Sequence, residues 1–321
     1  MKPAFWFALR KTLPPRSKLI VGSCSFLLPL LIWCLVSYVP FIWHPKIQIT
    51  SPGDVEYFQN GMLVDAADFV SESDNQRQLG KILPQGVPAN PVYLPAPHQV
   101  ALAFYTAFST EPKQRDGLWL HESLWHSIQV IFWGFMISSL LGVPLGILCG
   151  TYPALARLFE PFTEFFRYLP APAFGALAVA ILGIYDGPKI AVIVIGTFFQ
   201  QVLIISNTTR KLDFALLEAS MTLGARGIKL LTHVVIPGIL PDLYRDQRIL
   251  LGWAWTYLIV AELIGSSSGI TLFITQQARY TNFANVYAAI MMIGIIGLGT
   301  DLLLSILEKH LFPWERAANR D

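Results

Sequence analysis

Residues 211–241 read KLDFALLEASMTLGARGIKLLTHVVIPGILP, a stretch that predicts two short helices separated by a turn. Asp213 is a suitable N-cap for the first helix. Gly224 has the conformational freedom that commonly ends a helix, and the second helix should end near Pro237. Both helices are amphipathic, so we expect the pair to lie at a membrane surface.

The rest of the chain is more apolar than a soluble protein of this length. Of its 321 residues, 54% are hydrophobic and only 14% are charged, whereas a soluble domain carries about 25% charged residues. We interpret Cys24, Cys34 and Cys149 as packing residues, because each lies in or at the end of an apolar run. The surplus apolar surface should face a lipid bilayer, and the net charge of +2 does not indicate a nucleic-acid partner.

Six apolar runs predict helices that cross the membrane, which takes about 20 residues for about 30 Å of hydrocarbon. Basic residues precede the first run as in a signal peptide, but no small-residue cleavage site follows, so we expect a retained helix. The sequence thus predicts an all-α membrane protein with six transmembrane helices. The runs are Leu19–Ile42, Leu124–Leu148, Leu169–Ile184, Ile190–Ser206, Ile249–Ile264 and Val286–Leu307.

Lys and Arg predict the orientation, because they accumulate on the cytoplasmic side. With the N-terminus inside, 16 of the 23 basic residues lie on cytoplasmic segments and 7 on outer segments. Both termini should therefore be cytoplasmic. We expect a cytoplasmic N-terminus and first helix (1–43), an extracytoplasmic acidic and Pro-rich loop (44–123), and a five-helix core (124–321) with a cytoplasmic loop at 207–248.

The polar loop at 44–123 has some expected structure of its own. Ile47–Thr50 and Val92–Leu94 are candidates for short strands, and Ala101–Phe108 for an amphipathic helix at the membrane surface. The sequence leaves open whether this segment is a linker or a small docking or lid element.

Small residues recur at every fourth position of the second apolar run. On a helix they form a groove along one face, where a neighbouring helix can approach closely. We expect this helix to pack at the core of the subunit through Gly134, Ser138, Gly142, Gly146 and Gly150.

The sequence offers no catalytic or metal-binding cluster. Gly265–Gly269 matches the G-x-S-x-G nucleophile elbow, but it follows an apolar helix where that motif needs a strand. His121 and His126 are about 140° apart around a helix, too far to share a zinc ion. No G-x-x-x-x-G-K-[ST] loop is present to bind nucleotide phosphates. We predict no catalytic residue, no metal and no cofactor in this chain.

The opening stretch resembles the EAA loop of ABC importer permeases, which reads E-A-A-x3-G-x9-I-x-L-P. Glu218 and Ala219 match its start, Gly224 follows six residues after the glutamate, and Pro237 matches its end. Ser220, Val234 and Ile236 are mild departures. The resemblance implies that the loop couples the chain to an ATPase through Glu218, Ala219, Ser220, Gly224, Arg226 and Pro237.

The surrounding sequence, from about Tyr93 to Trp314, is similar to permeases of the nitrate, sulfonate and taurine importer family, which includes bicarbonate carriers. Matching segments are Leu124–Gly150, Glu160–Pro172, Gly252–Thr256, Ala261–Glu262, Ser267–Gly269 and Leu311–Trp314. The acidic stretch His44–Pro91 is longer than the usual connection in that family.

The resemblance implies a type I ABC transmembrane domain in the bacterial inner membrane. Its expected partners are a second copy of the permease as a homodimer, cytoplasmic ATPase subunits that bind ATP and Mg, and an extracytoplasmic substrate-binding protein. The expected solute is a small anion such as nitrate, bicarbonate, taurine or another sulfonate.

Glu262, near the outer end of the fifth run, is a carboxylate at a depth where charge is costly unless it is paired or faces water. It either forms a structural pair, for instance with Arg279, or lines the translocation path or gate with Ser267 and Ser268.

Two other functions are possible alternatives. A secondary transporter driven by an ion gradient should have internal repeats and broken helices near the membrane midplane, but the sequence shows no such repeat. A membrane enzyme is disfavoured because no plausible catalytic cluster assembles.

Overall fold

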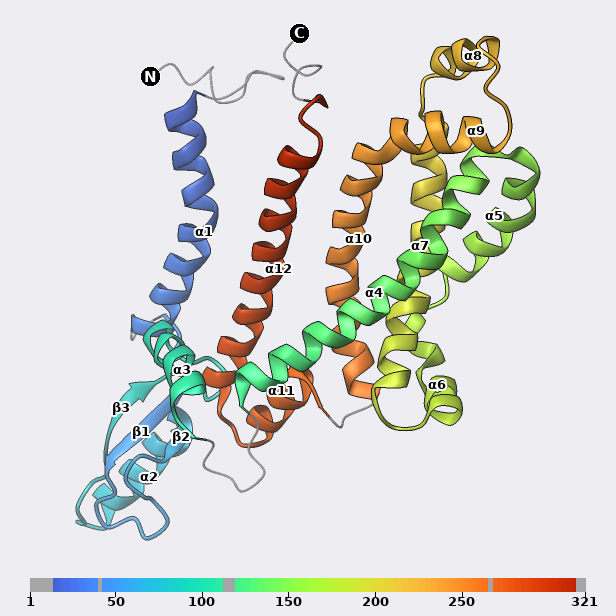
Figure 1. Ribbon diagram of the computed structural model, residues 1–321. Coiled ribbons are helices and arrows are strands. Elements are labelled where there is room, and N and C mark those ends of the chain that lie inside the picture. Colours follow the sequence, from blue (N-terminus) through green and yellow to red (C-terminus); the bar gives the residue numbers. More distant parts are fainter. Residues whose placement is uncertain (1–13, 40–41, 112–118, 265–267, 316–321) are drawn as a thin grey trace. The chain divides into compact units, whose positions relative to one another are not determined.

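The computed structural model describes residues 14–39, 42–111, 119–264 and 268–315 (Figure 1). The chain divides into two compact units. The first comprises Met1–Thr106 with Gln277–Ala288, and the second comprises Ala107–Gln276 with Ala289–Asp321.

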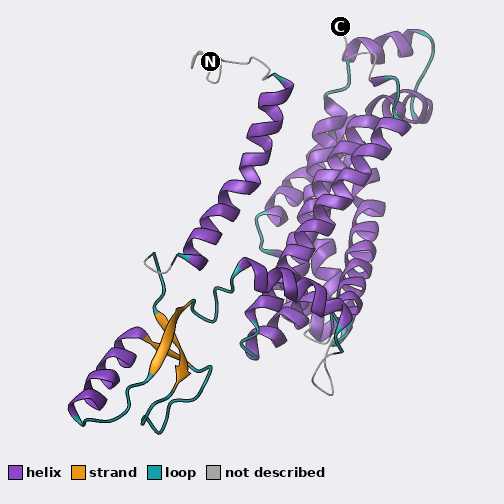
Figure 2. Ribbon diagram, turned by 90° about the vertical axis from the view of Figure 1, so that its left-hand side faces the viewer, coloured by secondary structure: helices purple, strands orange, loops and turns teal. Residues whose placement is uncertain are grey.

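The first unit contains a three-stranded antiparallel sheet, so the all-α prediction is wrong for this part of the chain. The strands β1 (Lys46–Ser51), β2 (Leu63–Asp65) and β3 (Gln85–Ala89) lie in the order β2-β1-β3, with α2 (Ala66–Gln78) beside them (Figure 2). In β1, Ile49 is buried, whereas its neighbours Gln48 and Thr50 are exposed.

The predicted strand at Ile47–Thr50 is confirmed as part of β1, but Val92–Leu94 lies in a turn. The physical reason is that prolines at 91 and 95 flank this short segment and restrict its backbone. Ile49, Val55 and Phe58 form the core of this element.

Contacts around α2 orient one acidic side chain, that of Glu72, and lower its pKa. Phe69 of α2 stacks on Phe58 with ring centroids 6.2 Å apart. Hydrogen bonds from Gln76 and Tyr57 hold the pKa of Glu72 below its ordinary value. The acidic stretch is therefore a folded element over these residues.

Two helices complete the first unit. In α1 (Pro15–Tyr38), Trp33 donates a hydrogen bond of 3.1 Å to the carbonyl oxygen of Pro95. Val100 and Ala103 of α3 (Pro97–Ser109) form a small core with Ala288. The helix predicted at Ala101–Phe108 is thus confirmed.

The second unit is helical and contains the long helices α4, α7 and α10, together with most of α11 and α12. Its elements are α4 (Leu120–Thr151), α5 (Pro153–Arg167), η2 (Ala171–Phe174), α6 (Gly175–Leu182), α7 (Asp186–Arg210), α8 (Phe214–Thr222), α9 (Ile228–Leu230), η3 (Leu231–Val235), α10 (Ile236–Ile264), α11 (Ile270–Arg279) and α12 (Phe283–Leu311).

Helices α4 and α7 pack closely through the small residues of α4. A Cβ atom added at Gly134, Gly142, Gly146 or Gly150 would come within 2.4–2.9 Å of an atom of α7, closer than side-chain carbons normally approach. Ser138, in the same row, donates a hydrogen bond of 2.6 Å to Oε1 of Gln201. Only residues this small let the two backbones approach so closely.

Four helices in the described part of the chain are long and apolar enough to cross a membrane: Arg16–Tyr38, Leu120–Thr151, Asp186–Arg210 and Phe283–Leu311. The pair Pro153–Arg167 and Ala171–Leu182, bent by 89°, makes a fifth if it is counted as one span. The apolar part of α10 corresponds to the predicted run Ile249–Ile264, but charged residues occupy the half of α10 before it.

The third predicted span, Leu169–Ile184, is wrong as a single straight helix. Pro170 and Pro172 interrupt it, because proline lacks an N–H and restricts the residue before it. The segment therefore forms the short helices η2 and α6 after a sharp bend from α5.

Candidate functional site

Helix α8 begins with the capping interaction expected from the sequence. The Asp213 side chain accepts a hydrogen bond of 2.9 Å from the N–H of Ala215. This bond satisfies one of the N–H groups that have no partner within a helix. Figure 1 shows α8 and α9 at one end of the helical unit, in the connection between α7 and α10.

The C-terminal end of α8 is closed by two hydrogen bonds around Gly224. The N–H of Ala225 donates to the carbonyl oxygen of Ser220, and the N–H of Gly224 donates to that of Met221, each at 3.0 Å. Gly224 has a φ of +92°. This pattern is the Schellman motif, which ends a helix with a left-handed residue.

The loop is anchored from one side only. Leu212 and Leu217 pack against a core formed by Ile147, Ile205 and Val235, at the ends of α4 and α7 and in η3. No residue of α8 is buried. The helix therefore has a fixed position in this unit and a free face.

The residues predicted for coupling lie mostly on that free surface. Glu218, Ala219, Gly224, Arg226 and Pro237 are exposed, and Ser220 is half-buried. The Ser220 hydroxyl donates a hydrogen bond of 2.7 Å to the carbonyl oxygen of Leu216, within α8 itself.

The second predicted helix does not end near Pro237. The chain continues through α9 and one π-helical turn, η3, directly into α10. Pro237 lies in the first turn of α10, directly after the π-helical turn η3. The loop is thus joined without a break to a long helix of the unit.

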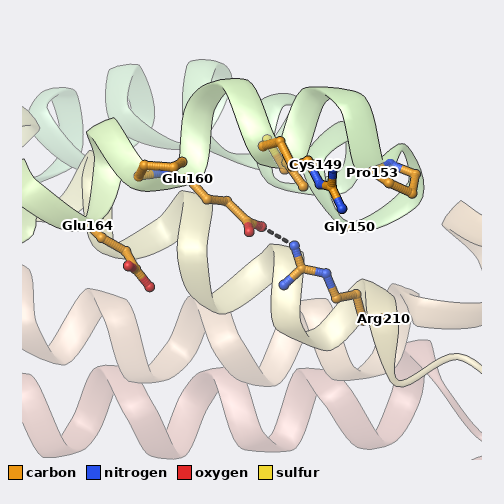
Figure 3. A pocket seen from close by; sticks show the side chains of 9 residues that line it. Cys149, Gly150, Pro153, Glu160, Glu164 and Arg210 are labelled. Carbon is orange, nitrogen blue, oxygen red and sulfur yellow. Dashed lines mark hydrogen bonds and ion pairs between the residues drawn. The ribbon is translucent and has the colours of Figure 1, made fainter.

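A cavity of about 420 Å³ lies beside the base of this loop, between the ends of α4, α5 and α7. Glu160 of α5 accepts a hydrogen bond of 2.6 Å from Ser206 and forms an ion pair with Arg210, the last residue of α7 (Figure 3). The ion pair therefore ties α5 to the point where α7 leads into the loop. The cavity is lined by Cys149, Gly150, Pro153, Ala156, Arg157, Glu160, Pro161, Glu164 and Arg210.

Glu262 lies in a second polar site, at the C-terminal end of α10. Its side chain is almost fully buried. It accepts hydrogen bonds from the Ser127 hydroxyl and from the N–H of Thr271, the latter at 2.8 Å. Neutral donors from α4 and α11 thus hold the carboxylate. The suggested pair with Arg279, which belongs to the other compact unit, stays a prediction.

Lys189 of α7 brings a buried positive charge to Ser268, six residues after Glu262 in the chain. It is fully buried, and its Nζ donates to Oδ1 of Asp186 at 3.0 Å and to Oγ of Ser268 at 2.7 Å. Ser268, named from the sequence with Glu262, is thus held in the same cluster. Ser267 lies outside the described residues.

His126 is close to both Ser268 and Asp186, but the three do not form a catalytic triad. The same ring nitrogen, Nε2, lies 2.9 Å from Asp186 Oδ2 and 3.3 Å from Ser268 Oγ. A triad needs the two nitrogens to serve the two partners separately, and Nδ1 of His126 is buried without one. Among the described residues, no group of three His, Cys, Asp or Glu side chains could hold a metal ion.

Two further polar networks join the helices between these sites. Gln201 of α7 is fully buried and bonds to Ser138, Ser139 and Gln247, linking α4, α7 and α10. Glu308 of α12 pairs with both Arg245 and Arg248 of α10, at 2.8 and 2.6 Å. The two networks thus tie α10 to α4, α7 and α12.

Comparison with known proteins identifies the family. Residues 142–316, more than half of the chain, match the family described as "Binding-protein-dependent transport system inner membrane component". The chain belongs to this family. It is a multi-pass inner-membrane permease component of a binding-protein-dependent ABC importer, and it is not itself the ATPase.

Individual relatives agree with this assignment. The chain is 33% identical over 192 residues to a probable ABC transporter permease protein of Brucella abortus, which covers 60% of this chain and 77% of that protein. It is 29% identical over 225 residues to the taurine transport system permease protein TauC of Escherichia coli, covering 70% and 81%.

A solved structure supports the fold. An inward-facing form of the MetNI methionine ABC transporter is similar with a TM-score of 0.53 at 19% identity, over 62% of this chain and 97% of that one. At this identity the likeness concerns the fold alone. The predicted fold of a type I ABC importer permease is thus confirmed, and the chain is mostly helical.

Sequence reasoning missed Lys189, Asp186 and Ser127 as members of the Glu262 site. Lys189 reads as an outer-loop charge at the start of an apolar run. A stronger signal was the pair of opposite charges three residues apart at the start of α7, which often forms an ion pair.

Proposed function

We propose that this chain forms the membrane pathway of an ATP-driven importer for a small anion and receives work from a separate ATPase through α8. The capped, exposed α8 carries this proposal. A short helix that is capped at both ends and is free on one face provides a rigid contact for a soluble partner.

The details of the loop support an ATPase as that partner. Ala219 and Ser220 are small enough for close approach, and Glu218 offers a negative charge on the exposed side. Leu217 connects the helix to the ends of α4 and α7. A displacement of α8 by ATP and Mg binding to the partner would therefore be passed to the membrane helices.

The solute class rests on relatives. TauC is a taurine transport permease, and the resemblance to nitrate, sulfonate and bicarbonate permeases indicates small anions in general. A buried lysine in the polar site of α7 agrees with an anionic solute. Glu262 and Ser268 then belong to the path or gate.

We also propose six membrane crossings with both termini in the cytoplasm. Along the chain, α5 with α6 forms the bent third crossing, and the apolar part of α10 forms the fifth. Asn75 of α2 would then be outside. A single cysteine at Asn75, in a chain without Cys24, Cys34 and Cys149, should react in intact cells with an impermeant maleimide. Reaction only after the membrane is broken would exclude this topology.

A second copy of the chain is proposed as the partner within the membrane. The exposed side chains of α12 include Ile295, Leu298 and Leu302, and these can face either lipid or the second copy. The mass of the detergent-solubilised complex distinguishes a permease homodimer from a heterodimer.

The alternative, a secondary transporter driven by an ion gradient, is tested by the energy source. Uptake into vesicles should require ATP and the ATPase on the cytoplasmic side. Uptake driven by an ion gradient without ATP would favour the alternative.

A further inference from the structure

Glu262 occupies a position that suits a bound anion. Its carboxylate accepts hydrogen bonds from the Ser127 hydroxyl and the Thr271 N–H. Thr271 lies in the first turn of α11, which begins at Ile270. The first N–H groups of a helix have no helical partner and favour negative charge. The chain therefore places its own carboxylate on donors that suit an oxyanion.

A buried cation of α7 contacts the residues just before α11. Lys189 donates to two oxygens of Ser268, to Oγ at 2.7 Å and to the carbonyl oxygen at 3.2 Å. Ser268 is only two residues before the first residue of α11. The ammonium group thus contacts the residue before Gly269, and α11 begins at the residue after it. Asp186 is a second internal carboxylate, held by the same ammonium.

Gly269 gives the site its shape. Its φ is +105°, and a Cβ atom at this position would lie only 2.1 Å from Oε1 of Glu262. The carboxylate is thus in direct contact with a backbone that has no side chain. Glycine at such a place permits close approach of the backbone to a bound group.

Unused hydrogen-bonding groups are present on the same elements. The hydroxyls of Ser123 on α4 and Thr271 on α11 are buried and have no partner among the described atoms. Both residues are less than 5% exposed. Buried polar groups normally have a partner. A sulfonate has three oxygens where a carboxylate has two, so a third oxygen would need one more donor.

We infer that this cluster is an anion site on the solute pathway and that Glu262 fills it in this structure. An incoming sulfonate or carboxylate displaces the Glu262 side chain, accepts the hydrogen bonds of Ser127 and Thr271, and is attracted by Lys189. Glu262 thereby keeps other anions from these donors as long as its side chain accepts their hydrogen bonds. The inference rests on the proposed function in one respect, the anionic solute.

The test removes the internal competitor. Glu262→Gln keeps the size of the side chain but removes the charge, and it leaves one oxygen for the two donors, Ser127 and Thr271, that now bind separate carboxylate oxygens. The full permease–ATPase complex, without binding protein, is titrated with radiolabelled taurine by equilibrium dialysis. Glu262→Gln should bind taurine about tenfold more tightly than the unmodified complex, which corresponds to about 1.4 kcal/mol.

Substitutions at Lys189 and a matched control show whether the gain in taurine affinity depends on this site. Adding Lys189→Met to Glu262→Gln should abolish the gain, whereas adding Lys189→Arg should retain most of it. Glu164→Gln, an exposed carboxylate on α5, is the matched control and should leave taurine affinity unchanged. ATPase co-purification shows that each variant is assembled. A loss of folding cannot mimic the result, because the central prediction is a gain.

Several outcomes would overturn the inference. These are an affinity of Glu262→Gln no higher than that of Glu164→Gln, a gain that survives Lys189→Met, or an equal gain for ethanolamine, a cation of similar size. Uptake by the unmodified complex distinguishes a failure of the anion site from a failure of the proposed function. Taurine uptake without a gain in Glu262→Gln rejects only the anion site, and uptake of uncharged solutes alone rejects the proposed solute class.

Discussion

The N–H of Ala225 donates a hydrogen bond to the carbonyl oxygen of Ser220 at 3.0 Å, and this bond closes α8 across Gly224. A Cβ atom added at Gly224 would meet nothing within 4 Å, although its φ is +92°. A side chain at this position therefore acts on the backbone and not on packing. Substitutions at Gly224 therefore test how strongly coupling to the ATPase depends on the shape of the turn.

Gly224→Val should abolish uptake and reduce binding of the ATPase. A β-branched residue at positive φ costs about 1–3 kcal/mol, so the turn should rearrange and move the loop after α8. Gly224→Asn should retain more function, because asparagine tolerates this conformation. The measurement is the amount of ATPase that co-purifies with each variant, together with uptake.

The matched control for this substitution is Gly61→Val. Gly61 also has positive φ, +84°, and open space around its Cβ position, but it lies in the sheet-containing unit. Its backbone strain is comparable, yet ATPase binding should be unchanged. Normal uptake by Gly224→Val with its ATPase bound would contradict the coupling assignment.

Glu218→Lys should weaken ATPase binding to a lesser degree. The side chain is exposed and, among the described residues, makes no hydrogen bond, so the substitution reverses a charge without disturbing α8. A partner surface that is complementary to a carboxylate would repel the lysine. Co-purification at two salt concentrations measures the effect, and an unchanged yield at low salt would exclude a charge contact here.

Gly150→Ala should lower the stability of the helical unit. The added methyl group would lie 2.4 Å from Cβ of Thr209 and 2.7 Å from the carbonyl oxygen of Ser206. Overpacking of this kind typically costs about 1–3 kcal/mol. The control is Gly252→Ala in α10, which has nothing within 4 Å and should be neutral or stabilising by up to about 1 kcal/mol. Thermal unfolding midpoints of the purified variants should differ in this order, and equal midpoints would contradict the packing of α4 on α7.

Removal of the sheet-containing element should spare ATPase coupling but weaken stimulation by the binding protein. Lys46 of β1 is paired with Ala89 of β3, so a short Gly/Ser bridge can join the two ends after deletion of residues 47–88. The element is polar and lies outside the core of the helical unit. ATPase activity is measured with and without the binding protein, and stimulation identical to that of the full chain would show that the element has no docking role.

The parts of the structure that follow local rules were predictable from the sequence. Asp213 and Gly224 mark the ends of α8 because capping depends on a few neighbouring residues. The period of four in α4 indicates a packing face, but it does not identify α7 as the neighbour. The chemistry of a cap is local, whereas the identity of a packing partner depends on the whole fold.

The features that were missed depend on tertiary contacts or on weak local signals. The strand β3 contains Gly86 and Pro88, both poor strand formers, so its pairing with β1 left no clear pattern. The π-helical turn before α10 cannot be read from residue types alone. The burial of Lys189 likewise involves a tertiary contact, a hydrogen bond to Ser268, which lies 79 residues further along the chain.

Reconstitution of uptake tests the central claim most directly. The permease and its ATPase are reconstituted in proteoliposomes together with the binding protein. Taurine accumulation is then measured in two separate conditions, with ATP supplied to the ATPase or with an imposed proton gradient across the membrane and no ATP. We predict accumulation that requires ATP, the ATPase and the binding protein together, and that is lost in Gly224→Val. Accumulation that follows the proton gradient without ATP would contradict the assignment of this chain as the permease of an ATP-driven importer.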